Sequence, residues 1–421
     1  MRVAVGTAGG IALAIGMAGP LGAQRPASVG TAAGLGGAAV VESRRADALL
    51  WNPALLPLWD GGASGSHSYG QVEVSQLPRR RWLEAAGPLG LAGDPSAAKR
   101  AEGIPGGVGN GSSASVVWAA SQSRGFAVSL SSHAHAAAEV PEEVAVAVAG
   151  RELPAEAGSA AEGGFGERAA QTVLAVGYGV AGVPVPGLRG LWVGATVKGA
   201  WTHEFARGAF AAGAPGGEVY REARVAGVPG LGLDVGGLVG GGGPVRAGIA
   251  VSNAAAWVFR PRRGPRLRVV SVGGAGGAGD VQSVRGPELD ETEPGSADRR
   301  LADGVWEDAK PAAVLRGGAA VEMPAGTVAL GYRRVLRDGG LEPDAMDDPF
   351  TVAYATPGAG VLRVFTSWGG GARTWGGAIG LGGCARRVVL GAERRGGAAD
   401  AGRVGVSASV VFGGAGCGRG P

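Results

Sequence analysis

Few residues in this sequence have the types and spacing that catalysis or metal binding requires. His133 and His135 lie two positions apart, so on a β-strand they would share one face and could form a metal pair. No third ligand follows at a recognisable spacing, which favours an incidental pair. The zinc-protease, nucleophile-elbow and Walker motifs are absent, and His203 is the remaining candidate for a hydrolytic Ser/His pair. We therefore predict no enzymatic activity, no metal and no cofactor.

Three charged residues have a spacing that suits ion pairing. Lys198, Asp234 and Arg246 fall on the polar phase of consecutive predicted strands, and opposite charges on neighbouring strands pair favourably when they face each other. We expect them to lie inside the fold as lumenal charges. They could form a purely structural set, or they could anchor an N-terminal segment through Glu42 or Asp47.

The start of the chain indicates export. A basic Met1-Arg2, an apolar run over residues 11–18 and small residues at Gly22-Ala23 predict a secretory signal peptide over residues 1–23, with an ordinary N-terminal helix as the alternative. The apolar run is too short to span a bilayer. The net charge of +4 and the lack of basic clusters interleaved with aromatic residues exclude nucleic acid as an expected partner.

Strict alternation of apolar and small or polar residues dominates the chain after residue 61. In one example, Val245, Ala247, Ile249 and Val251 alternate with polar and small residues, a pattern typical of a strand with two different faces. We predict fourteen strands, near residues 62–75, 113–121, 125–138, 170–180, 190–205, 229–240, 245–258, 312–323, 327–337, 350–356, 360–369, 373–383, 386–395 and 403–412.

The links between these predicted strands alternate in length. Short links follow every second strand, whereas the others are mostly long and hydrophilic, notably residues 76–112, 139–169 and 260–311. This layout is typical of an outer-membrane barrel with short periplasmic turns, and lipid requires such a barrel to close because it offers the backbone no hydrogen bonds. A soluble β-sandwich or propeller is the alternative. The leader, the number of apolar strand faces and a final strand ending in Phe412 favour the barrel.

The fold class that follows is all-β: a transmembrane antiparallel β-barrel of about fourteen strands over residues 61–412, with both termini periplasmic and residues 413–421 as a periplasmic tail. Residues 24–60 lack the alternation, and we predict that they form a plug in the lumen. At Trp51, Asn52, Pro53 and Ala54, the proline fixes its own φ and keeps Asn52 out of the helical region, so the asparagine side chain can cap the next turn. This element could position the plug as a gate, or it could be an ordinary helix start.

Two regions resemble a known family. Residues 34–54, which end in WNPA, resemble the N-terminal plug of the outer-membrane family that includes the long-chain fatty-acid transporters (FadL type) and the PorV/PorQ barrels. The runs LWVGATVKGA (191–200), GLGLDVGGL (230–238) and VRAGIAVSNA (245–254) are similar to the PorV side in order and spacing. The resemblance implies a monomeric barrel in outer-membrane lipid. FadL-type members pass hydrophobic molecules, and PorV-type members assist the export of secreted proteins.

Two functions are therefore expected. The first is passive transport of small hydrophobic molecules across the outer membrane, gated by the plug. The alternative is an accessory barrel of a protein-secretion system, whose outer loops dock secreted proteins. Cys384 and Cys417 both fall on the periplasmic side of the predicted topology, in an oxidising compartment, so we expect either a disulfide that fastens the tail or two free thiols.

Overall fold

The structure is a computed structural model of the 421-residue chain. It describes residues 35–43, 47–58, 62–73, 108–121, 125–140, 164–185, 188–210, 218–241, 243–259, 266–272, 281–288, 305–306, 309, 311–337, 350–356, 362–369, 372–382, 386–397 and 403–413. The predicted signal peptide, the tail after Gly413 and both cysteines lie outside the described residues.

The N-terminal described segment folds into four short helical pieces. They are η2 (Gly36–Ala38), α2 (Ala39–Glu42), α3 (Ala48–Trp51) and η4 (Pro53–Leu58). The Ser43 hydroxyl donates a hydrogen bond to the Ala39 carbonyl oxygen at the end of α2. Within the described part of the chain, no helix combines the length and the apolar character needed to cross a membrane. Residues 35–58 are called the plug segment below.

The remaining elements of the described residues are sixteen β-strands in a single sheet. Their bounds are β1 (Gly62–Glu73), β2 (Val108–Ser121), β3 (Phe126–Val140), β4 (Gly164–Val185), β5 (Leu188–Phe210), β6 (Glu218–Val239), β7 (Val245–Val258), β8 (Arg266–Val272), β9 (Val281–Glu288), β10 (Ala313–Met323), β11 (Gly326–Arg337), β12 (Phe350–Ala355), β13 (Leu362–Gly369), β14 (Ala372–Gly382), β15 (Arg386–Gly397) and β16 (Arg403–Gly413).

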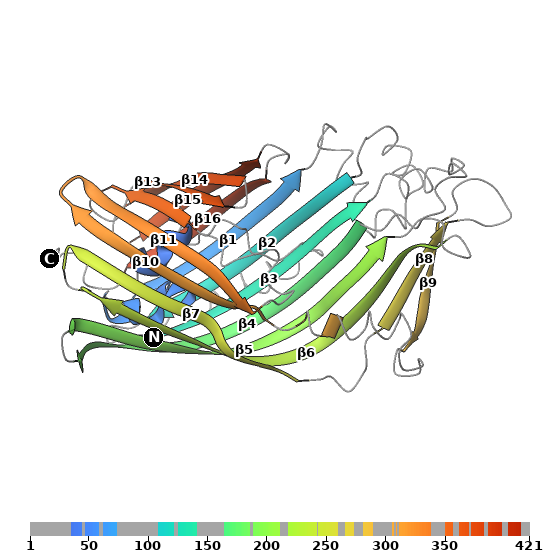
Figure 1. Cartoon of the computed structure of the whole chain (residues 1–421), viewed down its shortest axis with the longest axis horizontal. Coiled ribbons are helices and arrows are strands. Elements are labelled where there is room, and N and C mark those ends of the chain that lie inside the picture. Colours follow the sequence, from blue (N-terminus) through green and yellow to red (C-terminus); the bar gives the residue numbers. More distant parts are fainter. Residues whose placement is uncertain are drawn as a thin grey trace.

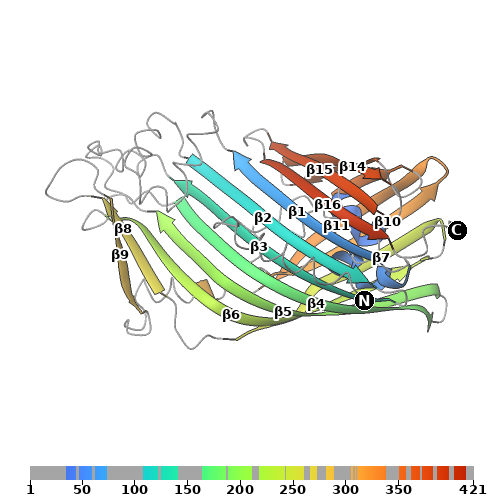
Figure 2. The same cartoon turned by 180° about the vertical axis from the view of Figure 1, so that it is seen from behind.

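The sheet closes on itself. Each strand from β1 to β7 and from β10 to β16 pairs antiparallel with its neighbour in the chain, and two further ladders, β7 with β10 and β1 with β16, complete the ring. Figures 1 and 2 show the resulting barrel from opposite sides, with the plug segment inside one end. The prediction of an antiparallel β-barrel is confirmed, and the described ring contains fourteen strands.

Six hairpin connections lie at one end of the ring, which we call the short-turn end, although the connection from Gly369 of β13 to Ala372 of β14, at the opposite end, is also short. The antiparallel ladders bring the β2–β3, β4–β5, β6–β7, β10–β11, β12–β13 and β14–β15 turns together at the short-turn end. The first pair of the closing ladder joins Gly62 of β1 to Gly413 of β16, so the barrel starts and ends at this same end. The opposite end is called the long-link end.

The prediction that residues 260–311 form only a hydrophilic link is wrong. This region contains β8 and β9, and Figure 1 shows them extending the sheet beyond the ring. The reason is the unequal length of two neighbours: β6 has 22 residues, whereas β7 has 14. β7 pairs with β6 only up to Val258, opposite Gly230, so the earlier half of β6 offers an open edge that β8 covers between Glu218 and Arg224.

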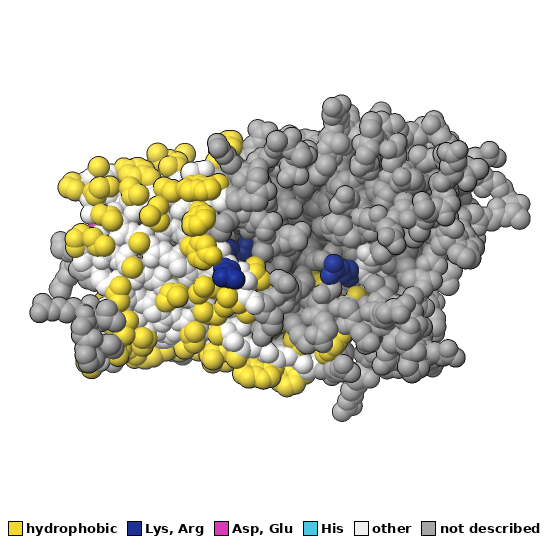
Figure 3. Space-filling model, viewed as in Figure 1, with side chains coloured by type: hydrophobic (Ala, Val, Ile, Leu, Met, Phe, Trp, Pro, Cys, Tyr) yellow, Lys and Arg dark blue, Asp and Glu magenta, His cyan; other side chains and the backbone are white. Residues whose placement is uncertain are grey.

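The outward face of the wall is apolar. Along β4, Leu174, Val176, Tyr178 and Val180 are exposed, whereas the intervening Ala175 is buried. Figure 3 shows hydrophobic side chains spread over the described surface of the short-turn half, with very few charged ones among them. A closed ring that faces outward with large apolar side chains is the arrangement that lipid requires. The fold is therefore a transmembrane β-barrel.

Candidate functional site: the plug segment and the lumen

The plug segment contacts the inner wall at positions where the wall has no side chain. At Gly194 of β5, an added Cβ would overlap the Pro53 carbonyl carbon and the Ala54 nitrogen. At Gly331 of β11, it would lie 2.5 Å from the Gly37 carbonyl carbon. A Cβ would come within 3.1 Å of a plug atom at seven wall glycines, which we call the glycine belt: Gly177, Gly179, Gly194, Gly236, Gly248, Gly318 and Gly331.

Asn52 connects the plug to itself and to the wall. Its Oδ1 accepts a hydrogen bond from the Ala54 N–H at 3.0 Å, which caps η4 in the way the sequence suggests. Its Nδ2 donates to the Val40 carbonyl oxygen at 3.1 Å and lies 3.3 Å from the Gly237 carbonyl oxygen of β6. The side chain is fully buried, and these hydrogen bonds take the place of the hydrogen bonds to water that the amide loses on burial. Gly236 leaves the space that the amide occupies.

Trp51 is the largest plug side chain at the wall, and 7% of it is exposed. The Arg316 guanidinium of β10 lies over its ring, 5.5 Å from the centroid, and also donates a hydrogen bond to the Ser252 hydroxyl of β7. Among the described residues, no hydrogen-bond partner reaches the Trp51 Nε1. A cation over an indole face in a buried setting is an attractive contact that fixes the tryptophan against the wall.

A buried ion pair joins the plug to β7. The Arg246 guanidinium pairs with the Glu42 carboxylate, and the two side chains are 5% and 3% exposed. A second carboxylate, that of Glu322 on β10, lies 3.5 Å from Arg246 and is half exposed. Breaking a buried pair leaves a charge without its main compensation, so this contact contributes more to plug seating than a surface pair would.

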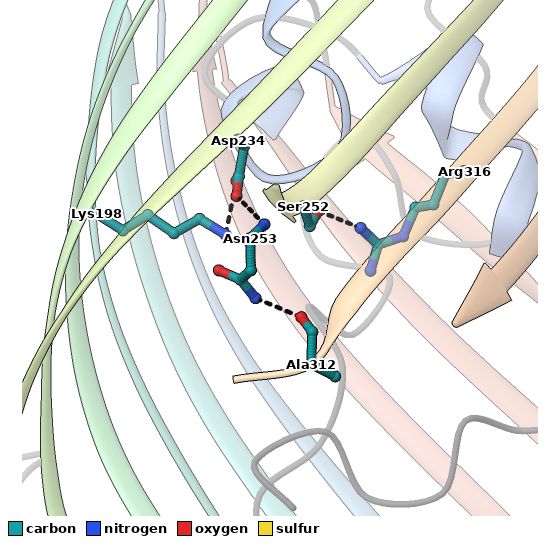
Figure 4. A network of polar contacts seen from close by, with 6 residues as sticks. All are labelled: Lys198, Asp234, Ser252, Asn253, Ala312 and Arg316. Carbon is teal, nitrogen blue, oxygen red and sulfur yellow. Dashed lines mark hydrogen bonds and ion pairs between the residues drawn. The ribbon is translucent and has the colours of Figure 1, made fainter. Parts of the chain in front are cut away.

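The three predicted lumenal charges do not form one ladder. Lys198 Nζ lies 2.6 Å from the Asp234 carboxylate, while Arg246 belongs to the separate pair with Glu42. The other Asp234 oxygen accepts a hydrogen bond of 2.7 Å from the backbone N–H of Asn253, as Figure 4 shows. The separation follows from the β6–β7 register, because Asp234 lies next to the pair of Val235 with Val251, whereas Arg246 lies beyond the pair of Val239 with Ala247 at the other end of the ladder.

Asn253 marks the point where β7 leaves β10. It has a φ of 51°, a left-handed value that asparagine tolerates better than most residues, and it lies in the β-bulge where the β6–β7 register shifts. The ladder between β7 and β10 ends at Ser252, and beyond it the Asn253 Nδ2 donates to the Ala312 carbonyl oxygen at 2.8 Å. The side-chain bond from Asn253 thus connects the two strands where the backbone ladder has stopped, next to the bond from Arg316 to Ser252 at the last pair of the ladder (Figure 4).

A second buried cluster lies toward the long-link end. A helical turn at Val305 and Trp306, with a hydrogen bond from the Ala309 N–H to the Val305 carbonyl oxygen, precedes β10. It packs on the later part of β5 and the earlier part of β6, on the concave side of the sheet (Figures 1 and 2). We call this the upper turn, and its cluster comprises Ala169, Phe205, Ala223, Val225, Val228, Val305, Trp306 and Ala309.

Among the side chains that the structure describes, the remaining predicted site residues give no chemical constellation. His133 and His135 lie in β3, opposite Gln171 and Ala169 of β4. His203 lies on the exposed face of β5 and shares a hydrogen bond of 2.8 Å with the Thr172 hydroxyl. Among the described residues, no group of three or more His, Cys, Asp or Glu side chains could hold a metal ion. The disulfide between Cys384 and Cys417 lies outside the described residues and stays a prediction.

Comparison with known proteins finds solved structures of similar fold, but at low sequence identity. No family model matches the chain, and no curated protein matches its sequence. Among solved structures, the CymD monoaromatic hydrocarbon channel is 12% identical, with 89% of this chain and 94% of that chain covered and a TM-score of 0.46. The deltaS2 mutant of the TodX monoaromatic hydrocarbon channel is 10% identical, with 92% and 98% covered and a TM-score of 0.43.

A third similar structure is the translocator domain of the autotransporter NalP from Neisseria meningitidis, 10% identical, with 84% of this chain and 87% of that chain covered and a TM-score of 0.34. The resemblance to the PorV/PorQ and FadL-type family stays a prediction. The function proposed below is therefore argued from the geometry of this chain.

The sequence analysis did not identify several residues that form the interior. Arg316 is one arginine among many until the β10 register places it over Trp51. Trp306 falls in a link that reads as hydrophilic, although its own apolar neighbour Val305 was a usable signal. The spacing of Gly177, Gly179 and Gly194 was visible, but glycine is so frequent, at 84 residues, that its positions carried little information.

Proposed function

We propose that this barrel lies in the outer membrane of a Gram-negative cell, as a monomer with both termini periplasmic, and passes small hydrophobic molecules. The observation that supports this is the presence of two apolar clusters in a lumen that also contains buried charges such as Asp234 and Arg316. Barrels that carry polar solutes have a polar interior. Here the described interior contains two apolar clusters, one around the plug segment and one around the upper turn. Moving an apolar solute from water onto such surfaces is favourable, whereas a sugar or an ion would lose hydration that the surfaces do not replace.

The plug segment is the proposed gate. Its helices contact strands from both halves of the ring, including β4, β5 and β6 on one side and β10, β11 and β12 on the other. A molecule that crosses the short-turn end must therefore pass where the plug now lies. Because the backbone at Pro53 and at Gly37 is in direct contact with wall glycines, the plug has to leave as one unit.

The first test is uptake by Gram-negative cells that express the chain. We expect radiolabelled oleate to enter several times faster than in cells with an empty vector, while uptake of radiolabelled lactose does not change. Equal oleate uptake in the two strains would contradict hydrophobic transport. Faster lactose uptake would instead indicate a leaky polar pore.

A second candidate function is an accessory role in protein secretion, in which the outer loops dock a secreted protein. The observation that favours it is the three-stranded extension of β6, β8 and β9 beyond the ring. Deleting residues 261–300 removes β8 and β9 but spares Trp306. Under this alternative, the deletion abolishes co-purification of secreted proteins and leaves oleate uptake unchanged. Under the leading proposal, no secreted protein co-purifies with the intact chain.

A further inference from the structure

Arg334 is a charged residue on the apolar outer face of β11. Alternation along the strand fixes its direction, because Gly331 faces inward against Gly37 of the plug, and residues of even number therefore point outward. Leu330 and Leu336 are each 54% exposed on the same face. Arg334 is also exposed, and its cross-strand partner on β10 is the apolar Leu315.

A row of aromatic rings lies beside Arg334. Tyr332 of β11, Phe350 of β12 and Trp368 of β13 occupy consecutive cross-strand pairs and are 36%, 49% and 41% exposed. The Tyr332 and Phe350 centroids are 5.4 Å apart, and those of Phe350 and Trp368 are 6.4 Å apart with nearly parallel planes. Trp375 of β14, 59% exposed, continues the row diagonally across the ladder from Trp368.

The row lies at the long-link edge of β12 and β13, the shortest described strands of the ring. β12 begins at Phe350, and β13 ends one residue after Trp368. Outward aromatic side chains form girdles at the two boundaries between hydrocarbon and headgroups. Arg334 lies two residues further along β11 than Tyr332, toward the long-link end, and so at headgroup depth.

The charge of Arg334 is not met by the described protein. Its neighbours on the outer face are Tyr332, Leu336 and Leu315, none of which is acidic. Among the described residues, its guanidinium takes part in no ion pair, hydrogen bond or ring contact. A planar guanidinium with donors in a fixed fork matches the oxygens of a phosphate.

We propose that Arg334, with the row Tyr332, Phe350 and Trp368, forms a binding site for the phosphate of a lipid headgroup in the outer leaflet. The guanidinium holds the phosphate oxygens, and the aromatic rings pack against the adjoining glycerol or sugar and the first acyl carbons. This site rests on the membrane orientation proposed above and not on transport.

Native mass spectrometry of the purified barrel in detergent tests the site. The probes are phosphatidic acid and diacylglycerol with identical acyl chains, which differ only in the phosphate. We expect at least a tenfold preference for phosphatidic acid in the unchanged chain and less than a twofold preference in Arg334→Gln. Arg334→Lys keeps part of the preference, because lysine supplies the charge without the fork. Trp368→Leu lowers binding of both lipids about equally.

The matched control is Arg224→Gln, which removes the same charge from a partly exposed arginine of β6 far from the row. It should retain the full preference. Glycerol 3-phosphate at the same concentration should not compete, because a lipid and not a free phosphate occupies the site. An unchanged preference for phosphatidic acid in Arg334→Gln would overturn the proposal. The proposal would also fail if the unchanged chain formed a dimer that Arg334→Gln dissociates, because Arg334 would then contact a second copy of the protein and not a lipid. Oleate uptake by Arg334→Gln should be unaffected, so failure here is distinguishable from failure of the transport proposal.

Discussion

The lumen holds two packed segments, and the wall meets them in different ways. The plug segment contacts the glycine belt with its backbone at Gly179, Gly194 and Gly331 and with side chains at the other four glycines, and it adds a buried ion pair between Glu42 and Arg246. The upper turn meets the wall through side chains, chiefly Trp306 against Phe205 and Val225. A seat formed by the backbone cannot adjust locally, whereas a side-chain contact can change rotamer. We therefore expect the backbone contacts of the plug segment to form or break together, and the side-chain contacts of the upper turn to adjust locally.

The largest expected effect comes from removing the buried cation. Arg246→Met should destabilise the seated plug by about 4 kcal/mol, because it removes the guanidinium from a carboxylate that is 3% exposed. The measurement is the rate of trypsin cleavage after Arg44 or Arg45, which should rise steeply. Glu322→Gln is the control, since that half-exposed carboxylate contributes less than about 1 kcal/mol. Equal rates in the two variants would show that the pair does not hold the plug.

The second largest effect is expected from adding a methyl group where the plug backbone contacts the wall. Gly194→Ala places a methyl group against Pro53 and Ala54 and should cost about 3 kcal/mol, measured as a lower urea midpoint of the barrel in detergent. Gly199→Ala on the same strand meets nothing within 4 Å and is the matched control. If both changes leave the midpoint unaltered, the glycine belt is not a seat, and the comparison between the two segments fails.

A truncation of the upper turn should separate the two regions. Trp306→Ala removes a side chain that is 8% exposed and should cost about 2–3 kcal/mol in local stability. Hydrogen exchange at β5 and β6 should accelerate, while trypsin cleavage at Arg44 and Arg45 stays at the unmodified rate. Faster cleavage at the plug would mean that the two segments are one cooperative unit.

The smallest expected effect on stability comes from replacing Asn253 in the β6–β7 bulge. Asn253→Gly relieves the positive φ of 51° but removes the bond from Nδ2 to the Ala312 carbonyl oxygen. The two contributions are of opposite sign and similar size, so the net change in unfolding free energy should be under about 1 kcal/mol. Asn253→Val loses the bond and keeps the strain, and should be less stable than the glycine variant. The reverse order in urea unfolding would show that the backbone here is not strained.

The wall could be predicted from the sequence, and the interior could not. Each strand face repeats every two residues, so a local pattern such as Val245 to Val251 already specifies a strand and its orientation. Contacts between Asn52 and Gly236, or between Trp51 and Arg316, join residues about two hundred positions or more apart. They depend on the register of ladders that only the closed ring defines. The β8–β9 extension was missed for a related reason, because it arises from unequal lengths of β6 and β7.

The most direct test of the central claim is to fasten the plug to the wall. Gly37 and Thr351 suit a disulfide, because a Cβ at Gly37 would lie 3.4 Å from the Thr351 Cβ, close to the separation that disulfides require. In a background with Cys384→Ser and Cys417→Ser, oxidised Gly37→Cys/Thr351→Cys should lose oleate uptake, and a reductant should restore it. Undiminished uptake with the plug locked would contradict a lumen gated by the plug.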